Sequence, residues 1–208
     1  MKIRDGVWSL DAGTGHCFLV VDKQCYLIDT GLPFAAGTVI RALGAMGVAP
    51  KDLKNILITH HDADHVGGLR AIQQWCGAKV WAHPLDIPYI EGKAERPGFK
   101  KQLGQWLAKP PLCDLRPYEG AMRVGPVQVI HTPGHTPGHV CLLYQGTLFA
   151  GDLVENKRGL LRPYPDKWNA DSAQLRRSVG SLKDVDYDLV CMAHGEPYRG
   201  RIEFLAEA

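Results

Sequence analysis

The chain has 208 residues, of which 45% are hydrophobic, and its formal charge at pH 7 is +2. A chain of this length can bury a full core in one domain, so we expect residues 1–208 to form a single domain. The small net charge gives no electrostatic case for nucleic-acid binding. Residues 1–6 lack the apolar run of a signal peptide, and no segment approaches membrane length. We therefore expect a cytoplasmic protein without membrane contact.

Apolar runs dominate the first part of the chain. Residues 16–21 and 25–30 flank a polar turn and predict a β-hairpin. Residues 34–46 carry apolar side chains at helical spacing and predict a helix. Four of the six cysteines lie within apolar strand-like runs, which indicates buried thiols rather than a disulfide framework. They are Cys17, Cys25, Cys141 and Cys191.

The most informative stretch is residues 59–68, which read THHDADHVGG. It follows the apolar run 55–58, which predicts a buried strand, and it precedes a helix that we expect to begin near Gly67. Three imidazoles and two carboxylates on so short a loop are costly to hold together without a cation. Imidazole nitrogen and carboxylate oxygen are ligands that divalent metals prefer. An ordinary polar turn needs a single Asp, so the loop predicts a metal site.

Residues 79–82 predict a further strand, and the character of the chain then changes. The segment 91–116 contains six basic and three acidic side chains, a net of +3 without His. Within it, residues 99–107 carry Phe, Leu and Trp on one face of a short helix. We expect an insertion that packs as a lid over the site. An ordinary surface helix with a solvated basic face explains the pattern equally well.

Three later apolar runs each end in a His or Asp close to a glycine. Glycine lets the backbone turn sharply and come close to a ligand. Strand ends that converge on one edge commonly carry functional sites. We expect these ends to complete the metal site. The runs are residues 127–130 before HTPGHTPGH, 148–150 before Asp152, and 188–192 before His194.

The segment that follows Asp152 has no clear periodicity, so residues 153–168 predict an irregular stretch. Within 157–167, four basic side chains stand against Asp166, again a net of +3. Residues 169–171 can cap a helix whose apolar side chains recur at positions 175, 179 and 182. No element is predicted for the tail 200–208.

These motifs together resemble those of the metallo-β-lactamase-fold hydrolases. The family pattern is T-H-x-H-x-D-H-x-G-G, then P-G-H-T-x-G-H, then G-D, then G-H-G. Here the motifs read as residues 59–68, 133–139, 151–152 and 193–195, in the same order and over nearly the whole chain. They come closest to small members similar to glyoxalase II and to lactonases. The resemblance implies an α/β (α+β) fold, a four-layer αββα sandwich. The residue pattern alone indicates only mixed α and β structure.

The resemblance also implies a dinuclear site with two divalent metal ions, most commonly zinc. Asp64 is then a catalytic residue as well as a ligand, because it would orient the attacking hydroxide. The implied ligands are His60, Asp62 and His135 for the first metal, Asp64, His65 and His194 for the second, and Asp152 as a bridge.

Asp62 departs from the family pattern, which has a histidine at this place. A carboxylate is a harder ligand and adds negative charge, so it admits iron or manganese beside zinc. Flavodiiron proteins, which share this fold, carry a Glu at the equivalent place and hold iron. His61 does not restore the pattern, because neighbouring side chains on an extended segment point in opposite directions. The last motif reads AHG in place of GHG.

The activity implied by the resemblance is metal-dependent hydrolysis. A metal-bridging hydroxide would attack the carbonyl of an ester, thioester or lactone. The basic segments predict a small anionic substrate, with Arg158 and Arg162 as contacts; solvated surface charge is the alternative. Two other classes stay open: an iron-dependent oxidoreductase of the same fold, similar to flavodiiron proteins or persulfide dioxygenases, and a non-catalytic metal-binding protein.

Overall fold

The computed structural model describes residues 1–95, 115–120 and 122–207. The chain forms two compact units, Met1–Pro117 and Tyr118–Ala208. Among the described residues, no helix has both the length and the apolar character needed to cross a bilayer. The segment proposed as a lid lies mostly outside the described residues, since only its ends, 91–95 and 115–116, are included.

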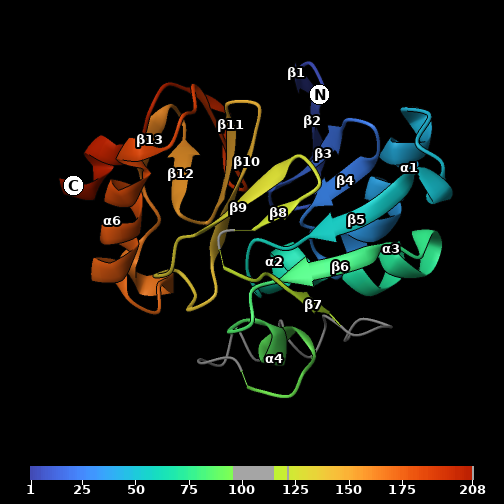
Figure 1. Cartoon of the computed structure of the whole chain (residues 1–208), viewed down its shortest axis with the longest axis horizontal. Coiled ribbons are helices and arrows are strands. Elements are labelled where there is room, and N and C mark those ends of the chain that lie inside the picture. The colour runs from blue at the N-terminus through green and yellow to red at the C-terminus, as the bar shows by residue number, and fades with distance from the viewer. Residues whose placement is uncertain (96–114, 121, 208) are drawn as a thin grey trace. The chain divides into compact units, whose positions relative to one another are not determined.

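In the described part of the first unit, seven strands form one sheet in chain order, coloured blue to yellow-green in Figure 1. The first four strands are antiparallel neighbours, and the pairs from β4 to β7 are parallel. The strands are β1 Lys2–Arg4, β2 Val7–Asp11, β3 His16–Val21, β4 Cys25–Ile28, β5 Leu53–Leu57, β6 Lys79–Ala82 and β7 Arg116–Pro117. Because β4, β5 and β6 run parallel, the loops that follow them leave from one edge of the sheet.

Helices α1 and α3 pack on one face of this sheet. Leu27, Ile56 and Val80 are register partners on neighbouring strands and face the same way. They belong to one buried cluster with Val39 of α1 and Ile72 of α3, all at most 1% exposed. Replacing one such side chain with Ala typically costs about 2–5 kcal/mol of stability. The helical segments are η1 Pro33–Ala35, α1 Ala36–Ala45, η2 Pro50–Asp52, α2 Ala63–Val66, α3 Leu69–Cys76 and α4 Ile87–Ile90.

The described part of the second unit is built on a six-stranded sheet in the order β15-β14-β11-β10-β9-β8. Its strands are β8 Arg123–Val124, β9 Val127–His131, β10 Val140–Tyr144, β11 Thr147–Gly151, β14 Leu189–Met192 and β15 Tyr198–Arg199. β11 and β14 are parallel, and β9 runs the same way because both β9 and β11 are antiparallel to β10. The carboxyl ends of these three strands therefore meet at one edge.

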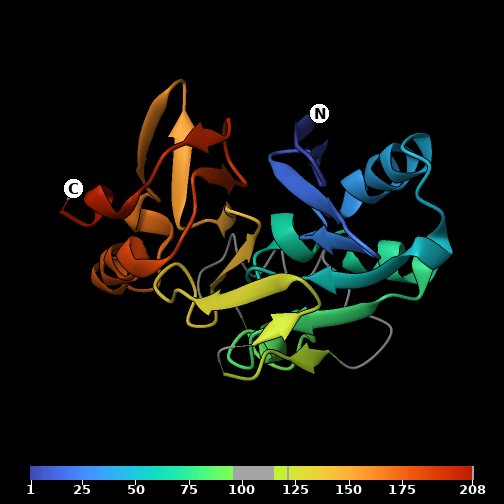
Figure 2. The same ribbon diagram turned by 45° about the horizontal axis from the view of Figure 1, so that its top comes forward.

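Helix α6 (Ser172–Ser181) covers one face of the second sheet. Its Leu175 and Val179 are at most 1% exposed and share a buried cluster with Leu148 and Val190, which are register partners on β11 and β14. The C-terminal turn η5 (Glu203–Glu207) lies beside α6 in both views (Figures 1 and 2). Short helical turns η3 (Asp166–Trp168) and η4 (Leu182–Asp184) flank α6.

Most predicted elements are confirmed, including the hairpin 16–30, the strands, and the helix after 169–171, which Asp171 caps by accepting a 2.8 Å hydrogen bond from the Gln174 N–H. One prediction was wrong. The segment 153–168 is not irregular, because it contains the hairpin β12 (Val154–Lys157) and β13 (Leu160–Pro163). Arg158 and Gly159 form its turn, with φ values of 56° and 80° that suit a tight two-residue loop.

The helix expected to begin near Gly67 is confirmed as α3 (Leu69–Cys76), but a separate helical turn precedes it on the metal loop. The turn α2 spans Ala63–Val66 and is followed by α3. Asp62 takes the N-cap position of α2, and Asp64 lies within its first turn. The sequence pattern missed this turn because four residues are too few to show helical periodicity.

Candidate metal centre

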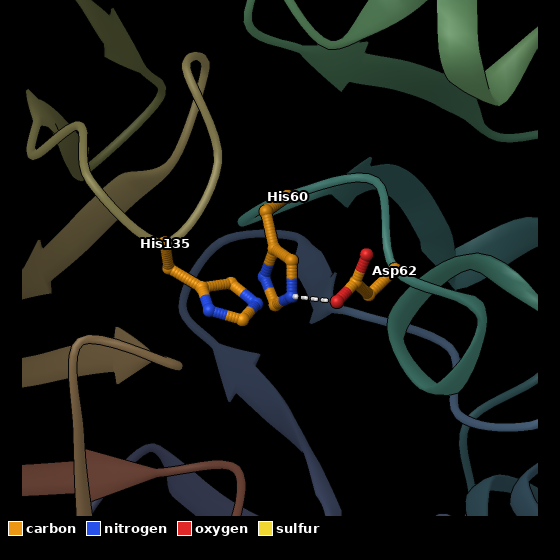
Figure 3. A group of neighbouring side chains, drawn as sticks. All are labelled: His60, Asp62 and His135. Carbon is orange, nitrogen blue, oxygen red and sulfur yellow. Dashed lines mark ion pairs between the residues drawn. The ribbon is translucent and has the colours of Figure 1, made fainter. Parts of the chain in front are cut away.

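Within the first unit, His60 and Asp62 lie on the loop that leaves the carboxyl end of β5 (Figure 3). His60 is 1% exposed, and its Nε2 lies 4.0 Å from Oδ2 of Asp62. The dashed line in Figure 3 marks this pair; His135, also labelled there, belongs to the second unit. A separation of 4.0 Å is too long for a hydrogen bond. It approaches the spacing of two donors on one tetrahedral ion, about 3.4 Å for bonds of about 2.1 Å.

His65 is anchored by a buried carboxylate from the neighbouring strand end. Its Nδ1 lies 2.8 Å from Oδ2 of Asp29, which follows β4. Asp29 also accepts hydrogen bonds from the Thr59 N–H at 2.8 Å and from the Thr59 hydroxyl at 2.7 Å. Because Nδ1–H of His65 points at a carboxylate, Nε2 is the ring nitrogen with a lone pair for a metal. Donor atoms of Asp64 and His65 lie within 4.8 Å of each other.

Two glycines let the metal loop pack closely on the loop after β4. A Cβ on Gly67 would lie 2.3 Å from Cδ of Pro33, and one on Gly68 would lie 2.4 Å from the Thr30 carbonyl oxygen. Thr30 also donates from its N–H and its hydroxyl to the His65 carbonyl, both at 2.7 Å. The two glycines of the motif therefore serve packing, and they bring His65 within reach of Asp29.

In the second unit, Asp152 lies between two imidazoles. Its Oδ2 is 3.7 Å from Nε2 of His135, and its Oδ1 is 3.5 Å from Nε2 of His194. Asp152 follows β11 and His194 follows β14, whose register pairs Gly151 with Met192. Each carboxylate oxygen thus faces a different ring nitrogen. Asp152 is 2% exposed, so protein atoms rather than water surround it.

The imidazoles beside Asp152 are held by neighbouring side chains. Nδ1 of His135 lies 3.1 Å from Oδ1 of Asn169, and the amide group of Asn169 donates to the Tyr164 carbonyl at 3.0 Å. The Tyr164 ring meets the His135 ring edge-on, with centroids 4.8 Å apart, and its centroid is 5.9 Å from that of His194. Asn169 therefore leaves Nε2 as the ring nitrogen of His135 that could bind a metal.

His139 acts on the backbone of the site. The Asp152 N–H donates to its Nε2 at 3.2 Å, so its Nδ1 carries the proton, which can reach the Thr132 carbonyl oxygen 3.1 Å away. His139 is fully buried. His131, by contrast, is exposed, and its Nε2 lies 3.0 Å from the Pro137 carbonyl oxygen. His139 thus supports a predicted ligand through that ligand's backbone.

Sequence reasoning missed several supporting residues. Asp29, Asn169 and Tyr164 contact predicted ligands, yet none belongs to a motif used to predict them. Asp29 had one local signal, since DTG follows an apolar strand and Asp29 adopts φ 59°. No local sequence signal marked Asn169 or Tyr164, because their partners lie far away in sequence.

The predicted substrate contacts lie on the β12–β13 hairpin. Arg158 is exposed at its turn. Arg162 pairs with Glu155, with Nε and Oε1 2.6 Å apart. Much of the Arg162 charge is therefore balanced within the hairpin.

The family model of the Metallo-beta-lactamase superfamily matches residues 10–194. The chain belongs to this superfamily. The match spans both compact units. It confirms the resemblance drawn from the motifs.

Similar proteins agree with this membership. A Bacillus subtilis (strain 168) protein described as probable metallo-hydrolase YybB is 29% identical over 186 residues, 87% of this chain and 80% of that protein. A hydroxyacylglutathione hydrolase of Alkalilimnicola ehrlichii is 34% identical over 139 residues, 67% of this chain and 46% of that enzyme. A Cronobacter sakazakii metallo-β-lactamase structure matches with a TM-score of 0.72 and 26% identity, over 93% of this chain and 77% of that one. The mixed α/β fold of the metallo-β-lactamase type is thereby confirmed.

Proposed function

We propose that this superfamily member is a metal-dependent hydrolase that cleaves an ester, thioester or lactone bond in a small anionic substrate. The observation that carries the proposal is the position of Asp152, whose two oxygens face His135 and His194 at 3.7 and 3.5 Å. These separations exceed hydrogen-bond lengths and match donors that share an ion. A carboxylate with one imidazole on each oxygen is suited to bridge two ions.

The donor set fits divalent metals, since each unit supplies imidazole and carboxylate donors, and the Nδ1 atoms of His65 and His135 are already anchored. When bound, such ions supply a Lewis acid that lowers the pKa of water to about 7. We propose zinc, with iron or manganese also admitted by Asp62. The proposed ligands are His60, Asp62 and His135 for one ion, Asp64, His65 and His194 for the other, and Asp152 for both; this assignment rests on the family motifs.

Side chains around the proposed ions would position the hydroxide and the ligands. Asp64, in the first turn of α2, would orient the attacking hydroxide by accepting its hydrogen bond. Asp29 keeps the proton of His65 on Nδ1, and Asn169 does the same for His135, so neither ring has to change its tautomer during turnover. His139 holds the backbone turn that presents Asp152.

Elemental analysis of protein grown without added metal, followed by a substrate panel on the same sample, tests the proposal. Asp152→Ala should lose at least one ion and abolish turnover, whereas His131→Asn, at an exposed imidazole, should change neither. Full metal content in Asp152→Ala would contradict the bridging role. No turnover of any ester, thioester or lactone by fully loaded protein would contradict the hydrolase.

The preference for an anionic substrate can be tested by salt dependence. The hairpin 154–163 has three basic side chains and one acidic, a net of +2. If this charge steers substrate, kcat/KM for an anionic ester should exceed that for its neutral isostere and should fall with ionic strength. Arg158→Ala should remove more of this difference than Arg162→Ala, because Arg162 is already paired with Glu155. Equal values without salt dependence would contradict the proposal.

One observation favours a second candidate, an iron-dependent oxidoreductase: Asp62 brings an oxygen donor to the position where the family has histidine. Iron in the purified protein, together with oxygen consumption and no hydrolysis, would favour it. A protein with bound metal and neither activity would instead favour the non-catalytic alternative.

A further inference from the structure

Asp62 stands where the family motif has a histidine, and its two oxygens face different imidazoles. Oδ2 lies 4.0 Å from Nε2 of His60, and Oδ1 lies 3.8 Å from Nε2 of His61. A free carboxylate can bind an ion through one oxygen or through both. A histidine binds through one nitrogen only. His61, the neighbour of Oδ1, therefore bears on whether Asp62 can act as a single donor, as the histidine that it replaces does.

His61 is buried and is held from its other side by α4 and the residue before it. Its Nδ1 lies 3.0 Å from Oδ2 of Asp86, and the same oxygen accepts the His61 N–H at 3.0 Å. The Nδ1 contact is within ion-pair distance, although its direction is poor for a hydrogen bond. The ring stacks on Tyr89, with centroids 4.5 Å apart and planes 20° apart. His61 is 3% exposed and Asp86 is fully buried.

These contacts fix the orientation of the His61 ring, unlike that of a surface imidazole. Its two ring nitrogens face two different carboxylates, Asp86 and Asp62. Stacking on Tyr89 and the backbone bond to Asp86 both oppose rotation of the ring. The turn α2 begins directly after Asp62, and the Asp62 carboxylate has His60 near one oxygen and His61 near the other.

We propose that His61 and Asp86 are positioning residues: His61 Nε2, 3.8 Å from Oδ1 of Asp62 and within ion-pair distance of it, closes to a hydrogen bond when an ion binds, and leaves Asp62 one oxygen for that ion. This inference rests on the proposed metal site. A carboxylate restricted to one oxygen acts as a single donor, as histidine does, and keeps the low coordination number that zinc prefers. Released from His61, Asp62 can bind through both oxygens, which favours the oxygen-rich, six-coordinate surroundings of manganese. The pair thus preserves zinc preference despite the substitution in the motif.

Zinc and manganese competition on metal-free protein tests the proposal. His61→Asn keeps a polar group near Asp86 but no longer reaches Asp62, whereas His61→Gln can still reach it. His61→Asn should lower zinc affinity about 10–100-fold, the usual effect of losing a group that orients a ligand, and shift the competition towards manganese. His61→Gln should retain most of the zinc preference. The absorption of bound Co²⁺ should weaken in His61→Asn as the coordination number rises.

A second variant covers the case in which His61→Asn fails to fold. Asp86→Asn still offers an oxygen to the His61 N–H and removes only the charge, and it should shift the metal ratio in the same direction. His131→Asn, at an exposed imidazole, is the matched control and should leave the ratio and the Co²⁺ spectrum unchanged. An unchanged ratio and spectrum in folded His61→Asn or Asp86→Asn, with metal bound to the wild type, would overturn this inference alone. A wild-type protein that binds neither ion would overturn the metal proposal and this inference with it.

Discussion

Replacing Asp29 with Asn examines how a predicted ligand is held without touching the ligand itself. Asp29 is 3% exposed and adopts φ 59°, a backbone conformation that Asn tolerates well. Its Oδ1 accepts the Thr59 N–H, and an amide oxygen can keep that bond. Its Oδ2, which serves the Thr59 hydroxyl and Nδ1 of His65, becomes a donor in Asn. The substitution therefore conserves shape and reverses one polar contact.

The reversed contact should act mainly on metal binding. An NH2 group can face Nδ1 of His65 only if that nitrogen has no proton, so the proton must move to Nε2. Nε2 then lacks the lone pair that a metal needs. Loss of such an orienting partner typically costs 10–100-fold in metal affinity, or about 1.4–2.7 kcal/mol. Folding should lose about 1.5–3 kcal/mol from one hydrogen bond to a charged group. The Thr59 hydroxyl can reduce that loss by turning towards Nδ1 of His60, 3.1 Å away.

Two measurements separate these effects. Competition with a chelator gives metal affinity, and urea unfolding of the metal-free protein gives stability. The matched control is Asp171→Asn, because Asp171 is an exposed helix cap at which Asn performs equally well. Unchanged metal affinity in Asp29→Asn would refute the tautomer reasoning, whatever happens to stability.

Three further predictions concern the second unit. Burial raises the pKa of the Cys141 thiol from its ordinary 9.0 to about 12, so the thiol's stabilising contribution is complete below pH 9.0 and is lost as the pH rises through about 12. The unfolding free energy of the wild type relative to Cys141→Ala should therefore fall across this pH window. A constant difference would contradict the raised pKa. Gly134→Ala should destabilise more than Gly159→Ala in thermal unfolding, because both have positive φ but only at Gly134 would a Cβ lie 2.3 Å from the Leu175 backbone nitrogen. Asp171→Ala should cost about 1 kcal/mol through the lost helix cap, and an unaltered urea midpoint would show that the cap contributes nothing.

Local patterns in the sequence predicted the strands, the main helices and the candidate ligands. The run 55–58 and the loop after it are readable because a continuous apolar run and the spacing of donors are properties of neighbouring positions. Family motifs then assigned roles to Asp152 and His194. The hairpin 154–163 was not predicted, because its strands β12 and β13 show only weak alternation of apolar and polar residues and Arg158-Gly159 is an uncommon sequence for a hairpin turn.

Only the tertiary structure decided which groups hold the ligands. His65 and Asp29 are 36 residues apart, His135 and Asn169 are 34 apart, and the N–H of His61 reaches a carboxylate 25 residues away. The first and third pairs meet because the parallel strands β4, β5 and β6 end at the same edge of a sheet, and the second meets because the segment before α6 packs on the loop that carries His135. His61, which local alternation sets aside as out of step, contacts Asp86 only because the loop after β6 brings that carboxylate beside it. Sequence therefore determined the candidate donor residues, while strand pairing and packing determined the orientation of their side chains, because the partners that orient them are distant in the chain.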